Sequence, residues 1–176
     1  MKTLKGYRYP WTASVEGDDL VVKGEHATWF GGEGDRYDDG STASGISTKG
    51  NPDFLGCALP MDFHRSGDNP CAGSPLPKLA WFTKVLVTNH DTGAQVTVSL
   101  IDLGPSAPPA ATAAIDLTQA AFKALGGSLA QGRLLVDFRI LGGAKQLGMA
   151  EVSTPASESP TAADGGDLSI TPEFLT

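Results

Sequence analysis

The sequence has few of the features that mark membrane proteins, nucleic-acid-binding proteins or disulfide-rich scaffolds. No apolar run approaches the roughly 18 to 20 residues of a membrane-spanning helix. Lysine and arginine are scattered as single residues, so no basic patch for a nucleic acid is expected. Only two cysteines and 7% aromatic residues are present. We therefore expect one soluble domain with no membrane span and no nucleic-acid partner.

Glycine and proline, in contrast, are abundant. The chain of 176 residues contains 22 glycines and 12 prolines, and so many backbone-breaking residues exclude a helical bundle or a coiled coil. Its 40% hydrophobic residues exclude a wholly disordered chain. This composition favours short strands joined by tight turns.

The two cysteines, Cys57 and Cys71, lie 14 positions apart. In an oxidising compartment, a disulfide between them would close a loop and contribute about 3 kcal/mol to stability. Two buried free thiols are the alternative. No signal peptide is expected in this chain, because residues 7–10 (YRYP) follow the positively charged start where an apolar stretch would be needed.

The net charge of −7 is concentrated at the C-terminal end. Residues 151–176 hold five acidic side chains and no lysine or arginine, whereas the other 150 residues hold 15 acidic and 13 basic ones. Residues 146–176 are rich in proline, serine and alanine and have little to bury, so we predict an acidic tail there.

The first half of the chain predicts a hairpin and then a long loop region. Residues 11–15 and 20–23 flank a Gly/Asp turn, and residues 27–30 resemble another short strand. From 31 to about 77, glycine, aspartate, serine, asparagine and proline are frequent. We predict a lid-like loop region there, of the kind that often carries function.

The second half is more regular. Residues 81–88 are apolar and β-branched, and residues 94–101 alternate with period two. The turn-forming residues 89–93 between them predict an antiparallel hairpin.

A single short helix is predicted over residues 119–125. Thr118 is a suitable N-cap and Gly126 a left-handed stop. Residues 134–141 predict a last strand. Many strands with one short helix indicate a mainly β fold, a small closed barrel.

Six segments in this order resemble double-psi β-barrel domains over about residues 27–141. They are ATWFGG at 27–32, TASG at 42–45, ALP at 58–60, VLVTN at 85–89, LIDLGP at 100–105 and AIDLT at 114–118. The chain is similar to the rare lipoprotein A family of peptidoglycan lytic transglycosylases and to the first domain of expansins. Those proteins share the barrel with family 45 glycoside hydrolases. The resemblance implies a six-stranded double-psi barrel at 27–145, preceded by the hairpin extension at 1–26.

Two aspartates match the functional positions of these families. The resemblance implies that Asp102 is the catalytic acid of a lytic transglycosylase. Asp116 matches an essential groove residue of bacterial expansins and the general acid of the family 45 hydrolases. Cleavage of a glycosidic bond needs a protonated carboxyl to deliver a proton to the leaving oxygen. A turn residue at Asp102 and a helix-start residue at Asp116 are the structural alternatives.

The resemblance also indicates where a polysaccharide would bind. Thr28, Trp29, Thr42 and Ser44 lie in its first two segments, and Trp29 could stack on a sugar face or pack in the core. No cofactor and no metal is expected, because the three histidines lack ligand spacing. Asp35, Asp38 and Asp39 form an acidic run without the complete calcium-loop pattern.

Some residues depart from the families' patterns. Rare lipoprotein A proteins usually carry glutamate and histidine at the positions of Ile46 and Gly56, and arginine at that of Leu103. We therefore predict action on a cell-wall polysaccharide, preferably peptidoglycan cleavage, in an extracytoplasmic or secreted location. A non-catalytic expansin-like glycan-binding module, and a structural or interaction barrel without the site, are the alternatives.

Overall fold

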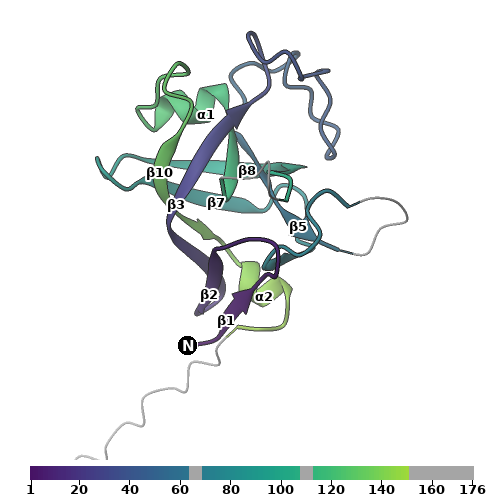
Figure 1. Cartoon of the computed structure of the whole chain (residues 1–176), viewed down its shortest axis with the longest axis vertical. Helices are drawn as coiled ribbons and strands as arrows, with labels where there is room; N and C mark the ends of the chain where they lie inside the picture. Colours follow the sequence, from purple (N-terminus) through teal and green to yellow (C-terminus); the bar gives the residue numbers. More distant parts are fainter. Residues whose placement is uncertain (64–68, 108–112, 151–176) are drawn as a thin grey trace, which may run out of the picture.

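The computed structural model describes residues 1–63, 69–107 and 113–150. These form a six-stranded mixed β-barrel, two strands that extend its sheet outside the barrel, a separate two-stranded sheet and two short helices (Figure 1). The elements are β1 (Thr3–Lys5), β2 (Thr12–Glu16), β3 (Asp19–Phe30), β4 (Gly56–Leu59), β5 (Met61–Asp62), β6 (Leu76–Pro77), β7 (Lys84–Asn89), β8 (Gln95–Leu103), β9 (Ile115–Thr118), α1 (Gln119–Ala124), β10 (Leu134–Ile140) and α2 (Gly143–Gln146).

The barrel closes because β9 pairs with two strands. The order is β3-β10-β7-β8-β4-β9, and β9 then pairs back with β3. The pairs β3–β9 and β4–β8 are parallel and the other barrel pairs are antiparallel. The predicted fold class, a mainly β six-stranded barrel, is confirmed. The prediction of one helix missed α2, which has only four residues.

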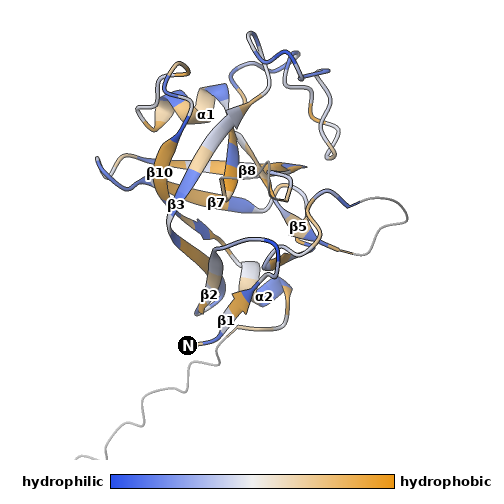
Figure 2. Ribbon diagram, viewed as in Figure 1, coloured by the Kyte–Doolittle hydropathy of each residue, from blue (hydrophilic) through white to orange (hydrophobic). Residues whose placement is uncertain are grey.

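Alternating side chains of the strands fill the barrel. In β10 every second residue is buried, namely Leu134, Val136, Phe138 and Ile140. Each such side chain contributes about 1.5–3 kcal/mol on leaving water. Figure 2 shows hydrophobic residues along the barrel strands and hydrophilic ones along the projecting loop between β3 and β4.

The hairpin predicted in the second half of the chain is confirmed. β7 and β8 pair antiparallel around the 89–93 connection. Asn89 is buried and its side chain organises this turn, accepting hydrogen bonds from the backbone N–H groups of Asp91 and Thr92. The same side chain donates to the Leu125 carbonyl at the end of α1 (2.9 Å).

The hairpin predicted at residues 11–23 is also confirmed, as β2 and β3. Its second strand does not stop near residue 23, however, and joins the predicted strand at 27–30 in one 12-residue strand. Gly24, at φ +67°, lies where β3 has one residue more than β10. This bulge lets β3 serve both the hairpin and the barrel.

The predicted loop region at 31–77 contains a barrel strand. All four residues of β4 are buried, and β4 lies between β8 and β9. A strand buried on both faces shows no alternation of polar and apolar residues, so periodicity does not reveal it.

The helix α1 begins after Thr118 as predicted, but the Thr118 hydroxyl does not cap it. This hydroxyl donates to the Phe54 carbonyl (2.6 Å) and accepts the Gly56 N–H (3.1 Å). It therefore ties the start of the helix to the segment that leads into β4. Gly126 has φ +84° and ends the helix in the left-handed conformation, as predicted.

The two cysteines are buried free thiols, so the structure has the predicted alternative and not the disulfide. Cys57 lies in β4 and packs in the core, whereas Cys71 lies in the loop before β6. Burial raises the pKa of both thiols, that of Cys71 to about 11. Neither thiol has the depressed pKa of a reactive cysteine.

No helix within residues 1–63, 69–107 and 113–150 is long and apolar enough to cross a membrane. The prediction of an acidic tail falls mostly on 151–176, outside the described residues.

Candidate functional site

Asp102 and Asp116 lie in one row across neighbouring strands. Asp116 of β9 pairs with Thr28 of β3 on one side and with Ala58 of β4 on the other. Ala58 pairs in turn with Asp102 of β8. Directly paired residues point to the same face of a sheet, so both carboxylates stand on one face with the small Ala58 side chain between them.

A β-bulge in β8 places Asp102 on this face. Against β4, the register moves from Cys57 opposite Leu100 to Ala58 opposite Asp102, which leaves Ile101 as the extra residue. Leu100 belongs to the core. In a regular strand, a residue two positions further would also point into the core. The bulge therefore turns Asp102 to the outer face.

Asp116 is partly buried on this face, and only one of its oxygens has a hydrogen bond from the described residues. The Thr28 hydroxyl donates to Oδ1. Burial raises the pKa of Asp116 to about 6, the bond from Thr28 opposes this rise, and the charges of Asp102 and Asp35 add to it. Near neutral pH this carboxyl can hold and release a proton.

Asp102 is anchored in the same one-sided way. Its Oδ1 accepts the backbone N–H groups of Ala43 (3.0 Å) and Leu103 (2.9 Å), while no described residue donates to Oδ2. Burial raises the pKa of Asp102; the two N–H groups oppose this rise, and the charges of Asp39 and Asp38 add to it.

A hollow of about 460 Å³ opens beside Asp102, between β8 and the projecting loop. Its wall includes Phe30, Tyr37, Asp38, Asp39, Thr42 and Asp102. Tyr37 is 83% exposed, and the guanidinium carbon of Arg36 lies over one face of its ring, 4.9 Å from the ring centroid. A second hollow of about 270 Å³ lies beyond Phe30, and neither Asp102 nor Asp116 lines it.

The four predicted binding residues have different roles in the structure. The Thr28 hydroxyl donates a hydrogen bond to Asp116. Thr42 lines the hollow, and its hydroxyl donates to the Ile46 carbonyl (2.7 Å). Ser44 bonds within its own loop, since its hydroxyl lies 3.1 Å from that of Thr42. Trp29 packs against the core, and its indole N–H donates to the Leu129 carbonyl (3.1 Å). Trp29 is thus placed as a packing residue.

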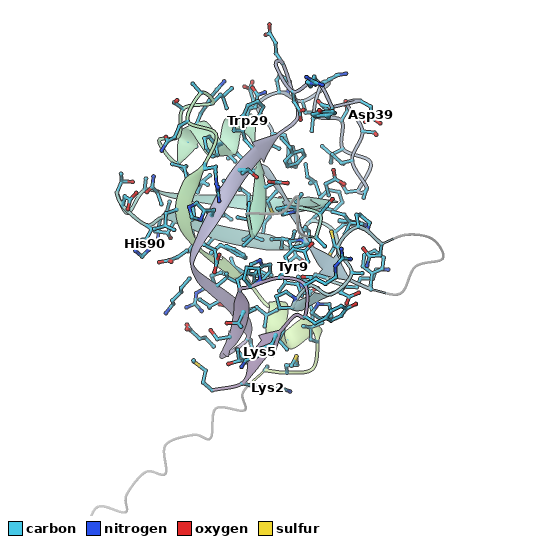
Figure 3. All side chains as sticks on the ribbon, in the orientation of Figure 1. Lys2, Lys5, Tyr9, Trp29, Asp39 and His90 are labelled. Carbon is cyan, nitrogen blue, oxygen red and sulfur yellow. The ribbon has the colours of Figure 1, made fainter. Side chains whose placement is uncertain are left out.

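The acidic run in the projecting loop organises the loop itself. Asp35 accepts the Gly31 N–H, Asp38 accepts the Gly32 and Gly40 N–H groups, and Asp39 accepts the Ser41 N–H. Figure 3 shows Asp39 on this loop, at the edge of the molecule. Among the residues that the structure describes, no three His, Cys, Asp or Glu side chains are grouped to hold a metal ion.

The sequence analysis did not identify three parts of the site, namely Ala58, the Ala43 N–H and Tyr37. Ala58 matters because it is small and lies between the two aspartates, which only the strand order reveals. Tyr37 had no distinguishing pattern around it.

The Thr28→Val variant is expected to raise the pKa of Asp116 above about 6. The hydroxyl stabilises the ionised carboxylate, and valine has a similar shape but no donor. A titration of ¹³C-labelled aspartate carboxyls by NMR measures the change. Thr97→Val on the exposed side of β8 is the matched control. An unchanged or lowered Asp116 pKa in Thr28→Val would contradict this account of the bond.

Comparisons with known proteins leave the family open. No family model matches the chain, and no curated protein matches it. Among solved structures, the chain is similar to the Streptomyces papain inhibitor (SPI), with 17% sequence identity and a TM-score of 0.42, over 72% of this chain and 99% of that one. The chain is a six-stranded mixed β-barrel with this structural similarity, and no family is assigned to it.

Proposed function

We propose that this protein binds a cell-wall glycan strand in the hollow beside Asp102 and cleaves its glycosidic bond with the Asp102–Asp116 pair. Peptidoglycan is the preferred substrate. The proposal rests on one observation above all, the placement of two carboxyl groups on one outer face, each with an oxygen that no described residue hydrogen-bonds.

The two aspartates suit different roles. Asp116, with its pKa raised to about 6, is the proton donor to the leaving oxygen. Asp102, at the wall of the hollow, accepts hydrogen bonds from sugar hydroxyls and supports the positive charge that develops on the sugar. The apolar face of a sugar can stack on the face of the Tyr37 ring opposite Arg36.

The spacing of the pair bears on the reaction. Two strand spacings put the aspartate Cα atoms roughly 10 Å apart. Direct attack by water needs the two carboxyl groups roughly 6.5–9.5 Å apart, a separation that side chains on strands two spacings apart can adopt. Attack by the sugar's own hydroxyl is the other route. The products of these two routes differ by the mass of one water molecule.

A digestion of purified sacculi tests the proposal. The full chain is expected to release soluble muropeptides, and mass spectrometry then tells hydrolysis from transglycosylation. Asp102→Asn is expected to reduce release at least about 100-fold while it stays folded, and Asp18→Asn in the β2–β3 turn serves as control. Binding of sacculi without release would favour the glycan-binding module. Neither binding nor release would favour an interaction barrel and would overturn the proposal.

A further inference from the structure

The N-terminal segment reaches the site through the Pro105 carbonyl. The Tyr9 hydroxyl donates a 2.8 Å hydrogen bond to this oxygen, and the Cys71 thiol donates to the same oxygen at 3.7 Å. Tyr9 is 5% exposed and Cys71 fully buried. Figure 3 shows Tyr9 between the barrel and the part of the molecule built by β1 and β2.

The turn that carries Pro105 lies beside Asp116 at one end of the carboxylate row. Gly104 donates its N–H to the Leu59 carbonyl (3.2 Å) and has φ +144°, a conformation that favours glycine. A Cβ atom at Gly104 would lie 3.5 Å from Asp116 Oδ2 and 3.9 Å from the Ala58 Cβ. The backbone of this turn therefore borders the oxygen of Asp116 that Thr28 leaves open.

Tyr9 is itself held in place from several sides. The N–H groups of Tyr7 and Arg8 both donate to the Gly73 carbonyl, at 2.9 and 3.2 Å. The Tyr9 ring meets the Trp11 ring edge to face, with centroids 5.8 Å apart. A fixed phenol can hold a loop in one position because few rotatable bonds separate its hydroxyl from the backbone.

We propose that Tyr9 is a positioning residue for Asp116, and that it acts by fixing the Gly104–Pro105 turn through the Pro105 carbonyl. The inference rests on the proposed function in what it says about catalysis, but the positioning itself can be measured without a substrate. It makes the N-terminal segment, which lies outside the six-stranded barrel, a part of the site.

The Tyr9→Phe variant tests this because it removes only the hydroxyl. With the turn loosened, water reaches Asp116 and its pKa is expected to fall toward the ordinary aspartate range. The other titratable groups that act on Asp116 are all still present in the variant, namely Asp102 on β8, Asp35 in the projecting loop, the Cys57 thiol on β4 and the Cys71 thiol before β6. NMR titration of the aspartate carboxyls in the full chain reads the shift. Tyr7→Phe, which removes an 80% exposed hydroxyl, is the matched control.

Turnover separates this inference from the proposed function. If sacculi are cleaved, Tyr9→Phe is expected to lower kcat at least about fivefold with KM little changed. Wild-type protein that cleaves nothing overturns the proposed function, while a shifted Asp116 titration in Tyr9→Phe still supports the positioning. An Asp116 titration identical to wild type overturns the positioning, whatever the activity.

A second pair of variants applies if Tyr9→Phe fails to fold. Cys71→Ser keeps a donor for the Pro105 carbonyl, whereas Cys71→Ala removes it. The inference expects the Asp116 pKa to fall in Cys71→Ala and to be restored in Cys71→Ser. Equal titrations in the two variants would overturn it.

Discussion

The Asp116→Asn variant is expected to lose glycan cleavage by at least about 100-fold and to be more stable than the wild type at pH 7. Asparagine cannot deliver the proton, but it can still accept the Thr28 hydrogen bond on its side-chain oxygen. It also removes a carboxylate whose ionisation burial opposes. The expected gain in unfolding free energy is about 3 kcal/mol.

The sign of this effect follows from the pKa of Asp116. In the folded protein the pKa is raised to about 6 from the ordinary aspartate value of 3.8. Between these values the folded state binds more protons than the unfolded state. The contribution of Asp116 to stability is therefore present in full below about pH 4, and is lost as the pH rises through 6.

Urea unfolding of both proteins at a series of pH values measures this difference. Asp116→Asn should match the wild type at pH 4 and exceed it at pH 7. Asp91→Asn, in the exposed turn between β7 and β8, is the control and should change neither stability nor activity. A less stable Asp116→Asn at pH 7 with unchanged activity would show that Asp116 serves only the fold.

The Gly104→Ala variant is expected to lose about 2 kcal/mol of unfolding free energy and at least about tenfold in glycan cleavage. The first loss arises because alanine is strained at φ +144°. The second arises because the new methyl group would stand 3.5 Å from Asp116 Oδ2, beside the oxygen that we expect to act.

The Gly93→Ala variant separates the two effects. Gly93 also has a positive φ, +75°, but a Cβ there would have no neighbour within 4 Å and the residue lies in the β7–β8 turn. It should lose stability by a similar amount, about 1–2 kcal/mol, and keep its activity. Equal activity in both variants and the wild type would contradict the role given to the 104–105 turn.

Local patterns predicted those elements whose signals are local. Residues 95–98 alternate in burial because one face of this part of β8 meets the core and the other meets water, and the turn residues after Asn89 set the hairpin. β4 was not predicted because both of its faces are covered and because its partners, β8 and β9, are distant in sequence. The Thr118 hydroxyl was predicted to cap a helix, and a tertiary contact with Phe54 takes it instead.

The candidate site also has parts that the sequence predicted and parts that it could not predict. Asp102 and Asp116 could be selected because the segments around them resemble those of known families, but their common face could not be predicted. It depends on the bulge at Ile101 and on the insertion of β4 between the two strands. Neither has a signature in the neighbouring residues, because a bulge is defined by the partner strand. The raised pKa of Asp116 follows from this packing and not from its own sequence neighbours.

A titration of short peptidoglycan-derived glycan strands into the full chain, with ¹³C-labelled aspartate carboxyls, tests the site most directly. It detects binding whether or not cleavage follows. We expect the carboxyl resonances of Asp102 and Asp116 to shift together on saturation, while those of Asp18 and Asp91, in the β2–β3 and β7–β8 turns, stay in place. Saturating glycan that moves neither Asp102 nor Asp116 would contradict the assignment of this face as a glycan site.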